Sequence, residues 1–312
     1  MSMTSSAASP SGTVLPGPRI MILALALALL AGLVGVPLAS PGATAVACVA
    51  LLVFGLPHGT LDLELIRARL SGPWTGMATL VALYLAFAAG MYAVWLVQPV
   101  LALAAFIAIA VAHFAEDWGA GPPLLRAAPA LALLAAPTLF HRAELDAIFI
   151  GLTNRADAGI VGAGLALLAP VAIGAAAWAM GRLWLRGERD LAIGALAAIA
   201  GMTILPPVVG FASYFCFFHS PRHFRHSLAD LDWRGVRKWG WVVLPLTVAA
   251  GLLAATLFGL QVRTQIADRI MAASFMTLSI LTVPHMLVPL VINRLARRRP
   301  RKVHLGGRKL SG

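Results

Sequence analysis

The chain has 312 residues, of which 60% are hydrophobic and only 12% are charged. Soluble domains carry roughly 45–50% apolar and about 25% charged residues, so this composition excludes an ordinary soluble domain and indicates an integral membrane protein. A formal charge of +12 would suggest nucleic-acid binding in a soluble protein, but here the basic residues cluster at the ends of apolar segments and in the tail. That distribution is typical of cytoplasmic anchoring, so we expect a lipid bilayer as partner and no nucleic acid.

The two ends of the chain differ from its apolar middle. Residues 1–18 are rich in Ser, Ala, Pro and Gly and are predicted to be a disordered N-terminal segment. The next segment, 20–39, has only Arg19 before it and is long enough to span, so we interpret it as a membrane helix rather than a signal peptide. Residues 19–293 are expected to form one transmembrane catalytic domain, followed by a basic cytoplasmic tail at 294–312.

Long apolar segments divide this domain into candidate membrane helices. A helix needs about 20 apolar residues to span a bilayer. We therefore expect an all-α polytopic transmembrane helix bundle of about ten spans, with a range of about eight to ten. The segments are 20–39, 43–60, 75–97, 99–117, 124–140, 159–184, 190–205, 207–224, 239–260 and 269–292. The division at Pro206-Pro207 stays open, since that stretch can form one broken helix or two short ones.

The distribution of Lys and Arg predicts the orientation. If the spans start and end in the cytoplasm, the basic residues left on the outer side are Arg142, Arg155, Arg263 and Arg269. Every other Lys and Arg is then cytoplasmic, as the positive-inside rule requires. We expect a multi-pass protein of the cell inner (plasma) membrane with both termini in the cytoplasm.

In this orientation five histidines fall in the cytoplasmic half of the bundle: His58, His113, His219, His223 and His285. His219 and His223 are four residues apart and share one helix face. Acidic residues follow His58 and His113 by three or four positions, namely Asp62, Glu116 and Asp117. Neutral imidazole is the usual ligand for iron, copper or zinc, and a carboxylate that accepts its other N–H orients it. The three acidic residues are therefore supporting candidates, and a carboxylate could also bind metal directly.

The remaining histidines have weaker claims. His285 is equally compatible with a structural role and a supporting role, and is given no ligand role. His141 falls on the outer side, His226 in a surface loop and His304 in the tail. Cys48 and Cys216 both lie inside apolar segments, so neither a disulfide framework nor a thiolate metal site is expected.

The histidine pattern indicates a membrane metalloenzyme that acts with oxygen on a lipid-soluble substrate. Aromatic residues beside the paired histidines are candidates to line the substrate site, chiefly Tyr214, Phe215 and Phe218. The alternatives are another metal-dependent membrane oxygenase, such as a desaturase or hydroxylase, a transporter with a histidine proton relay, and a haem-binding electron carrier. A desaturase usually needs about eight histidines, and a transporter would more often show an internal repeat.

Four motifs in this order resemble the Brp/Blh (bacteriorhodopsin-related protein-like) family of membrane β-carotene 15,15'-dioxygenases. They are Gly-Leu-Pro-His-Gly-Thr-Leu-Asp at 55–62, His-Phe-Ala-Glu-Asp at 113–117, Tyr-Phe-Cys-Phe-Phe-His-Ser-Pro-Arg-His at 214–223 and Pro-His-Met at 284–286. The resemblance covers residues 45–292. It implies an Fe(2+)-dependent enzyme that cleaves the central double bond of β-carotene with O₂ to give two all-trans-retinal, which a rhodopsin could receive.

The resemblance also implies a ligand set. The family's metal-binding histidines map onto His58, His113, His219 and His223. Three positions depart from the common pattern, namely Thr60, Leu63 and Ala115. These departures leave the expectation of iron binding intact and leave the identity of the carotenoid open.

Overall fold

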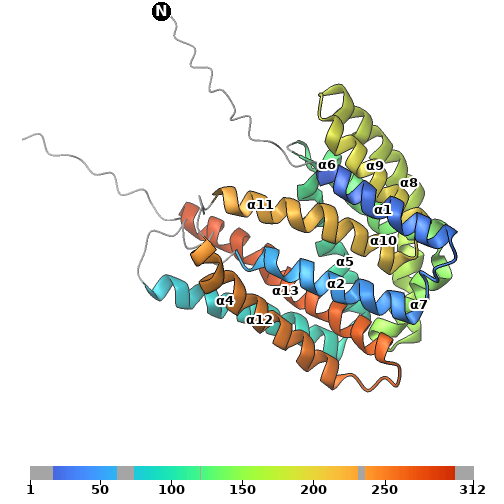
Figure 1. Ribbon diagram of the computed structural model, residues 1–312. Coiled ribbons are helices and arrows are strands. Elements are labelled where there is room, and N and C mark those ends of the chain that lie inside the picture. The colour runs from blue at the N-terminus through green and yellow to red at the C-terminus, as the bar shows by residue number, and fades with distance from the viewer. Residues whose placement is uncertain (1–16, 62–73, 120, 231–235, 299–312) are drawn as a thin grey trace, which may run out of the picture.

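A computed structural model describes residues 17–61, 74–119, 121–230 and 236–298 (Figure 1). These residues form helices joined by short turns, without a strand among them. The predicted all-α class is therefore confirmed for the described part of the chain.

A helix occupies each of the ten segments that the sequence predicted. The first half contains α1 (Gly17–Leu33), α2 (Pro41–Gly59), α4 (Trp74–Val97), α5 (Pro99–Phe114) with its 3-10 turn η1 (Ala115–Trp118), and α6 (Pro123–Ala135) with η2 (Ala136–Leu139). The second half contains α7 (Arg142–Thr153), η3 (Ala156–Ala158), α8 (Gly159–Leu185), α9 (Arg189–Ile204), α10 (Pro207–Tyr214), η4 (Phe215–His219), α11 (Ser220–Asp230), α12 (Val236–Leu260) and α13 (Ile266–Arg298). Proline opens α5, α6 and α10, where its missing N–H costs no hydrogen bond.

Fewer helices than predicted are long and apolar enough to cross a membrane. Among the described residues five pass this test: Ala78–Val97, Pro99–Trp118, Ala156–Leu185, Val243–Leu260 and Ile266–Val291. A sixth is formed if Pro123–Leu139 and Arg142–Thr153, which are bent by 106°, count as one broken span. The apolar helices Pro18–Leu33 and Pro41–Gly55 are shorter. The membrane-protein class is supported, but the count of about ten spans is not confirmed.

Helix α13 is the centre of one half of the bundle. It packs against α2, α4 and α12, whereas α8 packs against α6, α7 and α9. Figure 1 shows α2, α4, α12 and α13 on one side of the molecule and α1, α8 and α9 on the other, with α5 and α10 between them. Residues carried by α5, α10 and α13 therefore meet in the interior.

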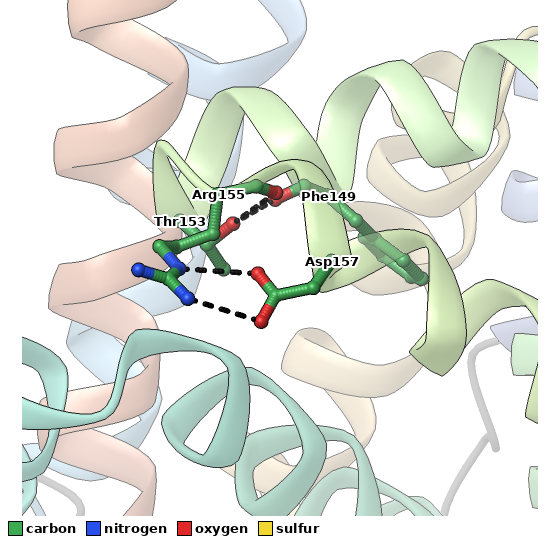
Figure 2. Close-up of polar contacts among 4 residues, drawn as sticks. All are labelled: Phe149, Thr153, Arg155 and Asp157. Carbon is green, nitrogen blue, oxygen red and sulfur yellow. Dashed lines mark hydrogen bonds and ion pairs between the residues drawn. The ribbon is translucent and has the colours of Figure 1, made fainter.

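The turn between α7 and α8 lies beside the loop that joins α12 to α13. Arg263 of the α12–α13 loop donates a hydrogen bond to the carbonyl of Leu152, near the end of α7, at 3.1 Å. Figure 2 shows its polar contacts: Thr153 donates to the Phe149 carbonyl at 2.8 Å, and Arg155 pairs with Asp157 at 3.1 and 3.2 Å. The hydrogen bond from Arg155 to Asp157 raises the pKa of this arginine. Both side chains of the pair are 60% exposed, so water competes for the contact.

Candidate metal centre and adjoining cavity

Four imidazole rings meet in the interior of the bundle. His113 lies near the end of α5, His219 ends η4, His223 lies on α11 and His285 lies on α13. The ring centroid of His113 is 4.6 Å from that of His219 and 4.7 Å from that of His285, and the centroids of His223 and His285 are 5.1 Å apart. The structure thus brings together three of the four predicted ligands and adds His285.

The helix that carries two of these rings contains an irregular turn. Residues Phe215–His219 form a π-helical turn between α10 and α11, closed by the bond from the Ser220 N–H to the Phe215 carbonyl. A π turn inserts one residue into the helical register and is frequent at functional sites. The Ser220 hydroxyl donates to the Phe54 carbonyl at 2.5 Å, which ties this turn to α2. The register shift therefore occurs at His219 itself.

The nitrogen atoms of the cluster are spaced as a metal site requires. One ligand nitrogen from each of His113, His223 and His285 lies within 4.8 Å of the other two. The Nε2 atoms of His113 and His219 are 3.0 Å apart. Two nitrogens bound to one ion at about 2.1 Å and at a right angle would be about 3 Å apart. His113 and His285 are buried, at 2% and 8% exposure, and His223 is partly buried, so these three residues could bind a metal ion. His219, at 0% exposure, is buried beside them.

A buried carboxylate orients His219. The Asp117 Oδ2 atom accepts a hydrogen bond from His219 Nδ1 at 2.8 Å and one from the Tyr214 hydroxyl at 2.5 Å. A neutral imidazole that donates from Nδ1 keeps its lone pair on Nε2, so His219 presents that nitrogen toward His113. Carboxylate–histidine pairs of this kind fix the tautomer and the orientation of metal ligands.

The other predicted supporting residues lie differently. Glu116 Oε2 is 3.9 Å from His223 Nε2 and its side chain is half exposed, so that contact is longer and wetter than the one made by Asp117. Asp62 and the side chain of His58 lie outside the described residues. The end of α2 nevertheless approaches the cluster, because a Cβ added to Gly59 would lie 4.0 Å from His285 Nδ1.

His141, which the sequence placed on the outer side, is not part of the cluster. The His141 Nε2 atom lies 3.2 Å from the Ile204 carbonyl, and its Nδ1 lies 3.4 Å from Glu144. His226 is exposed on α11, and His304 lies outside the described residues. His141 is therefore a suitable control residue.

A cavity of about 720 Å³ adjoins the histidines, which is large enough for a sizeable ligand. Its walls come from α2, α4, α5, α10, η4, α12 and α13, and His113 and His285 are among its lining residues. Three lining hydroxyls, those of Tyr84, Thr256 and Thr282, donate to the backbone carbonyls of Leu281, Leu252 and Leu278. Thr60 and Tyr92 are the other lining residues with hydroxyls, and the rest of the wall outside the histidines is apolar.

Of the predicted substrate-lining residues, Phe215 lines this cavity. Tyr214 and Phe218 are not among its lining residues and pack behind it. Tyr214 bonds to Asp117, and the Phe218 ring stacks on Trp118 with centroids 5.4 Å apart.

A family model described as "Beta-carotene 15,15'-dioxygenase" matches residues 49–292, which is most of the chain and includes every residue that lines the cavity. The chain belongs to this family. The chain is similar to a protein of the uncultured marine bacterium 66A03 that is named beta-carotene 15,15'-dioxygenase. The two are 28% identical over 256 residues, covering 77% of this chain and 90% of the relative. A probable beta-carotene 15,15'-dioxygenase Blh of Halobacterium salinarum is 28% identical over 320 residues, covering 87% of this chain and 90% of the relative. No solved structure gives a significant match.

Membership of the β-carotene 15,15'-dioxygenase family agrees with the resemblance read from the four motifs. Two parts of the site were not found by sequence reasoning. One is the place of His285 within the nitrogen cluster, and the other is the cavity wall formed by α12. His285 carried a signal, since its Pro-His-Met motif matched the family, whereas the α12 face is apolar and differs little from a lipid-facing one.

Proposed function

We propose that this chain is an iron-dependent dioxygenase that cleaves the central double bond of β-carotene with O₂ to give two molecules of all-trans-retinal. The observation that carries this proposal is a buried cluster of imidazoles at the wall of a large apolar cavity. The names of both relatives support the substrate and the bond that is cleaved.

We further propose that Fe(2+) is held by His113, His219, His223 and His285, with His58 as the remaining candidate ligand. Imidazole nitrogens without thiolates suit divalent iron, zinc or copper. The 3.0 Å separation of the His113 and His219 Nε2 atoms and the grouping of one ring nitrogen each from His113, His223 and His285 support this fit. When bound, the iron would supply the activation of O₂.

The protein's own residues would then prepare the reaction. Asp117 holds the Nδ1 proton of His219 and so fixes the direction of its Nε2 lone pair, and Tyr214 holds Asp117 in place. The apolar walls fix the polyene by dispersion contacts and exclude water from the reacting carbons. The histidines contact the cavity at one place, so one stretch of an extended polyene is presented to them.

The same proposal includes the cellular setting. The chain would be a multi-pass protein of the plasma membrane with both termini in the cytoplasm. Its single catalytic domain, at 19–293, would cross the membrane about ten times. β-Carotene would be taken from the bilayer, and the retinal would be released to it or passed to a rhodopsin.

The test is expression of the chain in bacteria that accumulate β-carotene, with retinal measured by chromatography. The wild-type chain is expected to bleach the cells and to form two retinal per β-carotene consumed. His113→Ala is the inactive comparison and His141→Ala the active control, since only His113 belongs to the cluster. Well-expressed wild-type protein that leaves the carotenoid unchanged would contradict the proposal, and longer apocarotenoid aldehydes would contradict the central position of cleavage.

A further inference from the structure

The cavity beside the histidines reaches the lipid-facing surface between two helices. Its lining residues on α4 fall at 81, 84, 85, 88, 89 and 92, and those on α12 at 246, 249, 250, 253, 256, 257 and 260. Each set has the spacing of a single helix face. In the described part of the chain α4 and α12 both pack on α13, whereas no comparable packing joins α4 to α12.

The same faces are open to the outside. Leu85 on α4 and Leu260 on α12 line the cavity and are nevertheless 62% and 61% exposed. Ala89 and Ala249 also line the cavity and are exposed. A side chain can border both a cavity and the surface only at an opening. The small alanine side chains in the middle of both faces keep this opening wide.

The opening lies at membrane depth. Its residues belong to the candidate spans Ala78–Val97 and Val243–Leu260. From Leu246 to Leu260 the cavity follows α12 for about 21 Å, at 1.5 Å per residue. A long hydrocarbon in the bilayer could therefore enter sideways without exposing its apolar surface to water.

We propose that the gap between α4 and α12 is the lateral entrance by which a long, apolar polyene passes from the bilayer to the histidines. This inference rests on the proposed function for its ligand class. It assigns a role to Ala89 and Ala249, which carry no polar group and line the cavity. Their small side chains leave space in the entrance for the polyene.

The test introduces a bulky side chain into the gap, once from α4 and once from α12. Ala89→Trp and Ala249→Trp place an indole in the entrance, and Ala86→Trp and Leu252→Trp are matched controls on the same helices, exposed but outside the cavity lining. Ala89→Leu is a milder variant that serves if a tryptophan prevents folding. Each purified protein is reconstituted in phosphatidylcholine vesicles and mixed with vesicles containing β-carotene.

Two readouts are taken: the rate at which carotenoid absorbance shifts on binding, and the rate of retinal formation. Ala89→Trp and Ala249→Trp are expected to slow carotenoid binding by about tenfold or more, whereas the binding rates of the two controls stay within about twofold of wild type. The metal content of all four tryptophan variants should match that of the wild-type protein. Entrance variants that bind carotenoid as fast as their controls would overturn the proposal.

The two proposals fail in different ways. A wild-type protein that binds the carotenoid but never forms retinal contradicts the proposed reaction, and the binding rates still decide the entrance. A wild-type protein that neither binds nor cleaves the carotenoid contradicts both. Slow turnover with unchanged binding rates in the entrance variants contradicts the entrance alone.

Discussion

Two aspartates at opposite ends of the bundle each bind a basic side chain, but in different surroundings. Asp117 is 3% exposed and accepts from His219 and Tyr214, whereas Asp157 pairs with Arg155 and both are 60% exposed. His285 lies about 30 Å along α13 from the end near Asp157, at 1.5 Å per residue. A buried carboxylate depends on its protein partners, because no water replaces a lost one, whereas an exposed pair is stabilised only slightly. The comparison predicts a gradient of mutational effects.

The largest effect is expected from His113→Ala. His113 contacts His219, His223 and His285, so its loss removes the ring shared by the whole cluster. Metal content should fall below about a tenth of wild type, because a ligand set that loses a member binds far more weakly. Retinal formation should become undetectable. Elemental analysis checks this, with His141→Ala as control, and a metal-replete His113→Ala would contradict the assignment.

His285→Ala is expected to have a nearly equal effect. Sequence reasoning gave this residue no ligand role, whereas its ring nitrogen groups with those of His113 and His223. Metal content should therefore drop together with activity. If His285→Ala keeps its metal and loses only turnover, the residue supports the centre without binding to it.

Asp117→Asn should weaken the centre without abolishing it. The amide keeps the size of the side chain but removes the charge that holds the His219 Nδ1 proton. Loss of such an outer partner typically costs about 10–100-fold in metal affinity or activity. Titration of the metal-free protein with Fe(2+) measures this, and excess metal should restore part of the activity. An unchanged affinity would show that His219 needs no orienting partner.

Tyr214→Phe should have a smaller effect than Asp117→Asn. It removes the hydrogen bond from the Tyr214 hydroxyl to Asp117 and leaves the bond from His219. We expect a metal affinity lower by a few-fold, up to about tenfold, because a typical lost hydrogen bond costs about 0.5–1.5 kcal/mol and this one acts on the metal only through Asp117 and His219. The affinity is measured by the same titration. A loss as large as that of Asp117→Asn would mean that Tyr214 acts beyond its contact with the carboxylate.

The smallest effect is expected at the exposed pair. Arg155→Ala removes the contacts to Asp157 that Figure 2 shows, but water takes the place of the guanidinium. Metal content, activity and melting temperature should all stay at wild-type values within error. A clear loss of stability would show that this turn matters more than its exposure suggests.

The sequence located the helices because apolar runs bounded by proline and charge mark them. It missed α7, which begins Arg-Ala-Glu-Leu-Asp and is apolar on one side only, so a search for continuous apolar runs does not detect it. The π turn at Phe215–His219 also escaped prediction, since its letters fit an ordinary helix equally well. Such features depend on tertiary packing.

The site residues could be predicted from the sequence where a polar side chain stands within an apolar helix. Histidines in apolar helices stand out, so His113, His219 and His223 were found. His285 was placed in the same half of the bundle but given no ligand role, and the packing of α13 against α5 brings its ring centroid to 4.7 Å from that of His113. The cavity face of α12 could not be found, because cavity-facing and lipid-facing leucines and alanines look the same in a sequence.

The most direct measurement is X-ray absorption spectroscopy of the purified protein at the iron edge. The account predicts one iron per chain surrounded by at least three imidazole nitrogens at about 2.1 Å, without sulfur. Protein that forms retinal yet holds no stoichiometric metal, or an iron bound mainly by sulfur or carboxylate, would contradict it.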